Sequence, residues 1–204
     1  MKQNQYIVAY RVGVSLLVLV AVWAQLLHGI SSISGFHTAN FFSFFTIQSN
    51  LLGALALLVA SSYLSRGKTS AWADNLRGAS AFFMLMTGVI YTLLLANADV
   101  QTPIPWVNFV LHYLFPIVML LDWVLIPPKK LPTLRQSSLW LIYPVLYVVY
   151  SLIRGAVTGW YPYPFLSVSS LGLWQVILNS IAIGIGVVIL SPLFAWLPRV
   201  RRAK

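Results

Sequence analysis

The chain has 204 residues, of which 59% are hydrophobic and only 8% are charged. Soluble domains carry about 25% charged residues, so this composition excludes an ordinary soluble protein and indicates one that lies in lipid. The formal net charge of +10 does not indicate nucleic-acid binding, because the basic residues form short clusters between long apolar runs, as membrane topology requires. The absence of cysteine excludes disulfides, thiolate metal sites and cysteine nucleophiles.

Six apolar runs approach or exceed the length that a membrane span needs, roughly 20 helical residues. They are Tyr6–Gly29, Asn40–Tyr63, Ala79–Ala96, Val107–Ile126, Ser138–Arg154 and Leu171–Trp196. The first run is too long for a signal peptide and lacks a cleavage site of the A-x-A kind, so we expect it to remain as a span. The sequence therefore predicts an all-α polytopic membrane protein, a six-transmembrane-helix bundle that forms a single domain over residues 1–204.

The basic residues predict the orientation of this bundle. All but one of the thirteen Lys and Arg residues lie on alternate sides of the spans, as Lys2, Arg11, Arg66, Lys68, Arg77, Lys129, Lys130, Arg135, Arg199, Arg201, Arg202 and Lys204. The other connections, residues 30–39, 97–106 and 155–170, contain no Lys or Arg and a single acid, Asp99. By the positive-inside rule we expect both termini in the cytoplasm, in a bacterial inner membrane.

Polar residues inside the second and fourth runs are candidates for function. Ser43, Thr46, Asn50 and Gly53 follow one another at steps of three and four residues, which predicts one small and polar stripe on a helix. Counting roughly 1.5 Å per residue from the outer ends of the runs places Thr46 and His112 at a similar depth. We therefore expect the two side chains to approach within about 4 Å, directly or through one water. Such residues also serve simply to pack membrane helices, and that alternative stays open.

Three further positions stand out on the fourth and fifth runs. Pro116 cannot donate to the carbonyl of His112, so we expect a kink there. Asp122 lies ten residues after His112, roughly 15 Å along a helix, so we expect it to pair with a loop Lys or Arg. Arg154 either snorkels to the outer surface or binds an anion beside Thr46 and His112.

The three histidines, His28, His37 and His112, all fall on the expected outer side and could hold a zinc ion with one open position. No H-E-x-x-H pattern accompanies them, His37 lies in a loop, and the nearest carboxylate is Asp99. We therefore expect neither a metal nor a cofactor.

Three stretches carry a resemblance to a known family: Phe41–Leu51, Asn108–Pro116 and Val157–Leu166. They resemble the androgen-induced and androgen-dependent membrane hydrolase family, in particular its bacterial six-span relatives. The resemblance implies an intramembrane hydrolase of fatty acid esters of hydroxy fatty acids, whose threonine nucleophile and histidine base fall on Thr46 and His112. Arg154 stands where animal members tend to carry a histidine, so lipid-ester hydrolysis is implied more strongly than one particular ester.

The chemistry of the residues agrees with this expectation. A threonine hydroxyl becomes nucleophilic when a neighbouring histidine takes its proton. The oxyanion and the substrate then need donors, for which the candidates are Asn50, Asn108, Arg154 and Ser43. The expected partners are membrane lipids and a lipid ester. The competing hypothesis is a non-enzymatic protein, either a lipid-binding scaffold or a small transporter, although no repeat of the kind that transporters use is visible.

Overall fold

The computed structural model describes residues 2–96 and 103–202, and the regular structure in these ranges is helical. Within them, six helical stretches are long and apolar enough to cross a membrane: Lys2–Ser32, Phe45–Ser65, Ala71–Leu95, Pro105–Leu125, Leu134–Thr158 and Leu173–Arg201. The expected all-α fold with six candidate membrane helices is confirmed, and it indicates an integral membrane protein. Asp99, most of its loop, and Lys204 lie outside the described residues.

The contacts divide the chain into two units, one up to Leu131 and again from Leu197, the other Pro132–Trp196. The first unit holds α1 (Lys2–Ser32), α2 (Thr38–Phe42), α3 (Phe45–Ser65), α4 (Ala71–Ile90), the π-helix η1 (Tyr91–Leu95), α5 (Pro105–Phe109), the π-helix η2 (Val110–Leu114), α6 (Phe115–Leu125) and α11 (Arg199–Arg202). The second holds α7 (Leu134–Leu139), α8 (Ile142–Thr158), the 3₁₀ turn η3 (Pro164–Leu166), α9 (Val168–Leu171) and α10 (Leu173–Trp196). The single domain over residues 1–204 stays a prediction.

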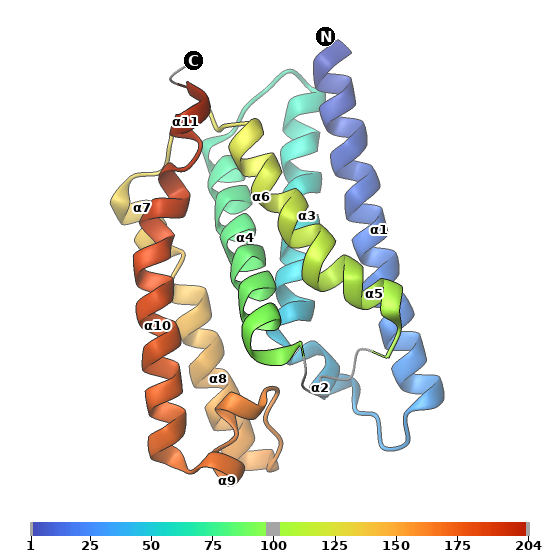
Figure 1. Ribbon diagram of the computed structural model, residues 1–204. Coiled ribbons are helices and arrows are strands. Elements are labelled where there is room, and N and C mark those ends of the chain that lie inside the picture. The colour runs from blue at the N-terminus through green and yellow to red at the C-terminus, as the bar shows by residue number, and fades with distance from the viewer. Residues whose placement is uncertain (1, 97–102, 203–204) are drawn as a thin grey trace. The chain divides into compact units, whose positions relative to one another are not determined.

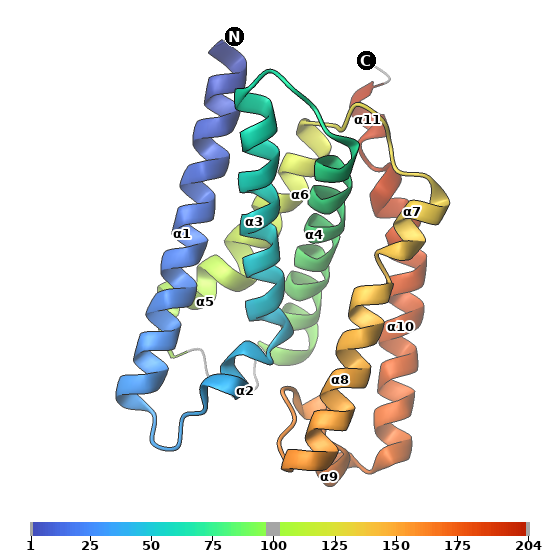
Figure 2. The ribbon, with the colours of Figure 1, turned by 180° about the vertical axis from the view of Figure 1, so that it is seen from behind.

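In the first unit, α3 packs against both α1 and α4, and α4 packs against α6 (Figures 1 and 2). The side chains of Leu57, Phe82 and Phe115 are fully buried between these helices. Small residues permit the close approach, since a Cβ on Gly53 would lie 2.8 Å from the ring of Phe115. Tight contact through small residues is the usual way in which membrane helices associate.

In the second unit, the expected span Ser138–Arg154 is divided into α7 and α8 by a turn at Trp140 and Leu141. Pro144 occupies the third position of α8, where an amide hydrogen would have no acceptor within the helix, so the proline is tolerated. The helix ends at Gly159, whose φ of 71° is a left-handed conformation that favours glycine.

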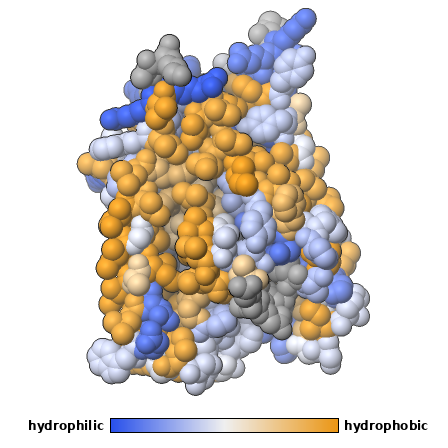
Figure 3. All heavy atoms as spheres, in the orientation of Figure 1, coloured by the Kyte–Doolittle hydropathy of each residue, from blue (hydrophilic) through white to orange (hydrophobic). Residues whose placement is uncertain are grey.

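The outer faces of the candidate spans are apolar. Figure 3 shows hydrophobic side chains over much of the surface in this view, and hydrophilic residues at several places that include the N-terminal end of α1. On α10, for example, Leu178, Ile181 and Ile185 are more than half exposed. Such a surface suits contact with lipid chains and would be unfavourable in water.

The second span begins later than the sequence predicted. The chain forms the short helix α2, then α3 starts at Phe45, after Phe44 in extended backbone. Ser43 ends α2, and its hydroxyl donates to the carbonyl of Ala39 at 2.6 Å. The expectation of one continuous stripe from Ser43 through Thr46 was therefore wrong, because the helix is interrupted between them.

Candidate functional site

Thr46 is the second residue of α3 and is 9% exposed. Its carbonyl accepts hydrogen bonds from the Asn50 side chain at 2.8 Å and from the Ser49 hydroxyl at 3.2 Å. Ser49 also shares a hydrogen bond of 2.9 Å with Thr87 of α4. The first turn of α3 is thus fixed both to its own helix and to its neighbour.

His112 is 5% exposed and lies in the π-helix η2. The amide of Phe115 donates to the carbonyl of Val110, five residues earlier. In this register the next donor would be Pro116, facing the carbonyl of Leu111, and proline has no amide hydrogen. The structure has a π-helical turn at the histidine, and the expected kink stays a prediction. The carbonyl that Pro116 leaves without a π-helical partner belongs to Leu111 and not to His112.

Asn50 joins the turn of Thr46 to the turn of His112. Its Nδ2 donates to the carbonyls of Thr46, at 2.8 Å, and of Leu111, at 3.2 Å. An amide nitrogen has two hydrogens, and both are used here. The expected role of Asn50 as an oxyanion donor is therefore not supported by its geometry, and Asn50 instead holds α3 against η2. The direct approach of the Thr46 and His112 side chains stays a prediction.

The imidazole ring of His112 is held by two neighbours. Its Nδ1 lies 2.7 Å from Oδ1 of Asn108, one turn earlier. Its face stacks on the ring of Tyr91, with centroids 3.8 Å apart and planes 16° apart. The sequence did not identify Tyr91, because its pairing with His112 depends on the packing of η1 beside η2 and leaves no local signal. The expected spacing of Asn108 and His112 on one face is confirmed by their hydrogen bond.

Arg154 belongs to the second unit, near the end of α8. Its guanidinium carbon lies 4.8 Å from the centroid of the Trp160 ring, a cation–π contact. The two expected roles of Arg154, snorkelling to the outer surface and binding an anion beside Thr46 and His112, both stay predictions.

Of the histidines considered for zinc, His28 lies on α1, His37 precedes the first residue of α2 and His112 lies in η2. Within residues 2–96 and 103–202, no group of three or more His, Cys, Asp or Glu side chains could hold a metal ion.

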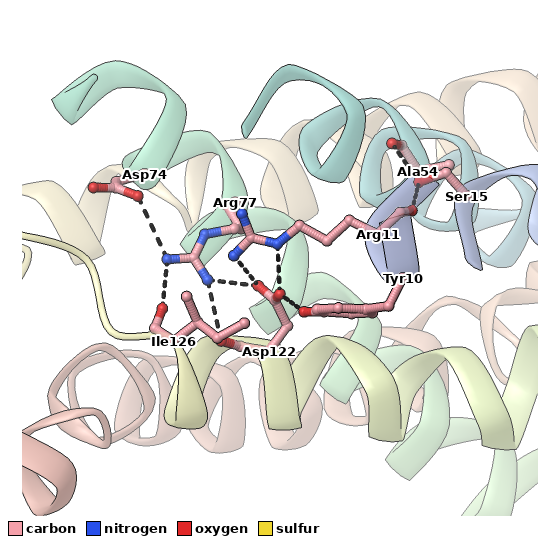
Figure 4. A network of polar contacts seen from close by, with 8 residues as sticks. All are labelled: Tyr10, Arg11, Ser15, Ala54, Asp74, Arg77, Asp122 and Ile126. Atoms are coloured by element: carbon pink, nitrogen blue, oxygen red, sulfur yellow. Dashed lines mark hydrogen bonds and ion pairs between the residues drawn. The ribbon is translucent and has the colours of Figure 1, made fainter. Parts of the chain in front are cut away.

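A second polar site lies further along α6, around Asp122 (Figure 4). The Asp122 carboxylate accepts from Arg11 Nε of α1 at 2.7 Å and from Arg77 Nη1 of α4 at 2.5 Å. The hydroxyl of Tyr10 also donates to it. All three charged residues are at most 3% exposed, so this ion cluster joins three helices inside the first unit.

Arg77 makes further contacts from the same position. Its Nη2 donates to the carbonyl of Ile126 at 2.9 Å and to Asp74 at 3.4 Å, and its guanidinium lies 5.1 Å from the Trp123 ring centroid. Asp122 therefore pairs with arginine as expected, but the partners are buried helix residues and not loop residues. The expectation was wrong on this point because Arg11 and Arg77 lie within α1 and α4.

No family model, curated protein or solved structure matches this chain. The function must therefore be inferred from its buried polar groups.

Proposed function

We propose that this protein is an intramembrane hydrolase of long-chain acyl esters, in which Thr46 is the nucleophile and His112 the base. One observation carries the proposal: Asn50 donates to the carbonyls of Thr46 and of Leu111, the neighbour of His112. Because both bonds end on one nitrogen, the two carbonyl oxygens can be no further apart than the two bond lengths combined. The Thr46 hydroxyl and the His112 imidazole thus belong to adjacent turns of two packed helices. Both residues are buried.

The proposed reaction has two steps. The Thr46 oxygen attacks the ester carbonyl while His112 takes the hydroxyl proton and passes it to the departing alcohol, leaving an acyl-threonine. Water, activated by the same imidazole, then releases the fatty acid and restores the hydroxyl. Fatty acid esters of hydroxy fatty acids are the substrate class that the sequence resemblance suggests.

The start of α3 supports stabilisation of the oxyanion. Thr46 lies in the first turn of a 21-residue helix, where the helix dipole is positive. This environment favours a negative charge beside the hydroxyl. In the proposal, the positive end of the helix dipole takes the place of the Asn50 side chain, whose amide hydrogens are already used.

We propose that the reaction takes place within the bilayer. The helices are apolar enough for a bilayer, and an ester dissolved in lipid can reach a buried site between helices where a water-borne ester could not. We place both termini in the cytoplasm of a bacterial cell, on the basis of the Lys and Arg distribution.

The test uses the purified protein in detergent with a long-chain acyl ester of a hydroxy fatty acid. We expect Thr46→Ala and His112→Ala each to reduce kcat/KM by about 10³-fold or more, and the double variant to lose no more than either single one. Thr46→Ser should retain activity because a hydroxyl remains.

A matched control is Ser15→Ala, which removes another buried hydroxyl that bonds between helices, to Ala54 at 3.2 Å. It should turn over as the unchanged protein does. A fluorophosphonate probe, mapped by mass spectrometry, should modify Thr46. If no lipid ester is hydrolysed, or if Thr46→Ala is fully active, the polar residues serve packing, and a non-enzymatic membrane protein becomes the better description.

A further inference from the structure

The atoms that form the hydrogen bond between Asn108 and His112 determine which residue is the donor. The atom of Asn108 that faces the imidazole is the amide oxygen, 2.7 Å from Nδ1. An amide oxygen carries no hydrogen, so the proton of this bond must lie on Nδ1. A neutral imidazole has a single N–H, so Nε2 then carries no hydrogen and is the ring atom that can accept a proton.

The ring also has little freedom to reverse this arrangement. Tyr91, from the neighbouring π-helix, stacks on its face at 3.8 Å, and His112 as a whole is 5% exposed. A ring flip would carry Nδ1 away from Asn108 and break this partly buried hydrogen bond. Two residues from two elements thus fix both the plane and the orientation of the imidazole.

We propose that Asn108 is a positioning residue that holds His112 in the Nδ1–H tautomer, so that Nε2 is the atom that takes the proton. The kinetic consequence rests on the proposed hydrolase function, whereas the tautomer itself does not. Asn108 was considered above as an oxyanion donor, and its geometry assigns it instead to the histidine. Free neutral histidine favours the opposite tautomer, with the proton on Nε2, so the effect of Asn108 is directly measurable.

The experiment reads the tautomer without substrate. Protein labelled with ¹⁵N-histidine is placed in detergent micelles at roughly pH 8.5, about two units above the ordinary pKa of histidine. Long-range ¹H–¹⁵N correlation spectra then distinguish a protonated from a bare ring nitrogen. His28→Gln and His37→Gln leave one histidine, so its signals are assigned without ambiguity.

We expect His112 to show a protonated Nδ1 and a bare Nε2. Asn108→Asp keeps an acceptor oxygen in the same place and should preserve this pattern, whereas Asn108→Leu removes it and should move the proton to Nε2. A protonated Nε2 in the unchanged protein would overturn the proposal. So would an Asn108→Leu variant that keeps Nδ1–H.

The kinetic arm separates this inference from the hydrolase proposal. With an ester that the protein hydrolyses, Asn108→Leu should lower kcat on the order of 10³-fold with little change in KM, because the wrong tautomer cannot accept the proton. Asn108→Asp should recover most of that loss. If the tautomer is as expected but no ester is hydrolysed, the hydrolase proposal alone fails. If hydrolysis occurs and Asn108→Leu is fully active, the positioning role fails.

Discussion

Arg77 donates two hydrogen bonds to Asp122, one to its main-chain carbonyl at 3.2 Å and one to its carboxylate at 2.5 Å. The other carboxylate oxygen of Asp122 forms an ion pair with Nε of Arg11. One aspartate therefore pairs with guanidinium groups from two other helices, and the side chains of all three residues are at most 4% exposed.

Replacing Asp122 should destabilise the protein strongly. Asp122→Asn leaves two buried guanidinium groups without their anion, and breaking a buried pair in this way costs about 3–5 kcal/mol. The measurement is the free energy of unfolding in detergent. Asp74→Asn is the matched control, because the Asp74 side chain is 24% exposed and its bond to Arg77 is 3.4 Å long, so a loss of about 0–1 kcal/mol is expected. Equal losses for the two variants would contradict the assigned role of Asp122.

Gly155 should not tolerate a side chain. A Cβ there would lie 2.0 Å from the Tyr161 ring, so Gly155→Ala must displace the ring, at a cost of about 1–3 kcal/mol. Gly184→Ala is the control on α10, since a Cβ at that position would have no described atom within 4 Å; alanine should there stabilise the helix by about 0.5–1 kcal/mol. Thermal unfolding followed by circular dichroism would compare them, and a Gly155→Ala midpoint at or above that of the unchanged protein would refute the packing argument.

Gly88 should affect activity more than stability. Its Cβ would lie 3.0 Å from Pro116 and 3.4 Å from the His112 carbonyl, so Gly88→Ala pushes Pro116, the residue at the start of α6 next to η2, by a few tenths of an ångström. Given the proposed hydrolase function, we expect kcat to fall about 10-fold, since small displacements of catalytic groups are costly. Gly13→Ala, with open space around its Cβ among the described residues, should keep its activity. Unchanged turnover in Gly88→Ala would contradict the prediction that this contact positions His112.

The proposed orientation can be tested on a chain that has no native cysteine. Ser34 and Lys68 are exposed residues beyond opposite ends of α3. With Lys68 on the cytoplasmic side, a membrane-impermeant thiol reagent should label Ser34→Cys in intact cells and Lys68→Cys only in inverted vesicles. The reverse pattern would invert the topology, and labelling of both residues from one side would mean that α3 does not cross the membrane.

The membrane helices could be predicted from the sequence because an apolar run of sufficient length is a local property. The residues that the structure adds depend on contacts between helices. Arg11 and Arg77 were assigned to the cytoplasmic ends by their charge, but their burial follows from Asp122, more than forty positions away from either in the sequence. The signal that was available is the carboxylate itself, since an acid inside an apolar run needs buried partners.

The candidate site was predicted in part. The four-residue spacing of Asn108 and His112 correctly placed them on one face. Pro116 led us to expect a kink at His112, and the structure shows that His112 lies in the π-helix η2. The break before Thr46 was not predicted, because the aromatic segment around Phe44 is as apolar as a continuous helix would be. The role of Asn50 also could not be predicted from the sequence. Its second acceptor is the carbonyl of Leu111, which has no main-chain donor in the π-helical register of η2 because Pro116 lacks an amide hydrogen.

The Asp122 cluster also bears on how the protein is made. Synthesis proceeds from the N-terminus, so a nascent chain contains Arg11 and Arg77 before it contains the aspartate that pairs with them. An arginine at the centre of a lone membrane helix costs about 2.5–3.5 kcal/mol on insertion scales. The first and third spans should therefore stay near the translocon, or keep their guanidinium groups near the lipid headgroups, until the fourth span emerges. Insertion of α6, which carries Asp122, would then be the last step in the co-translational assembly of these four spans.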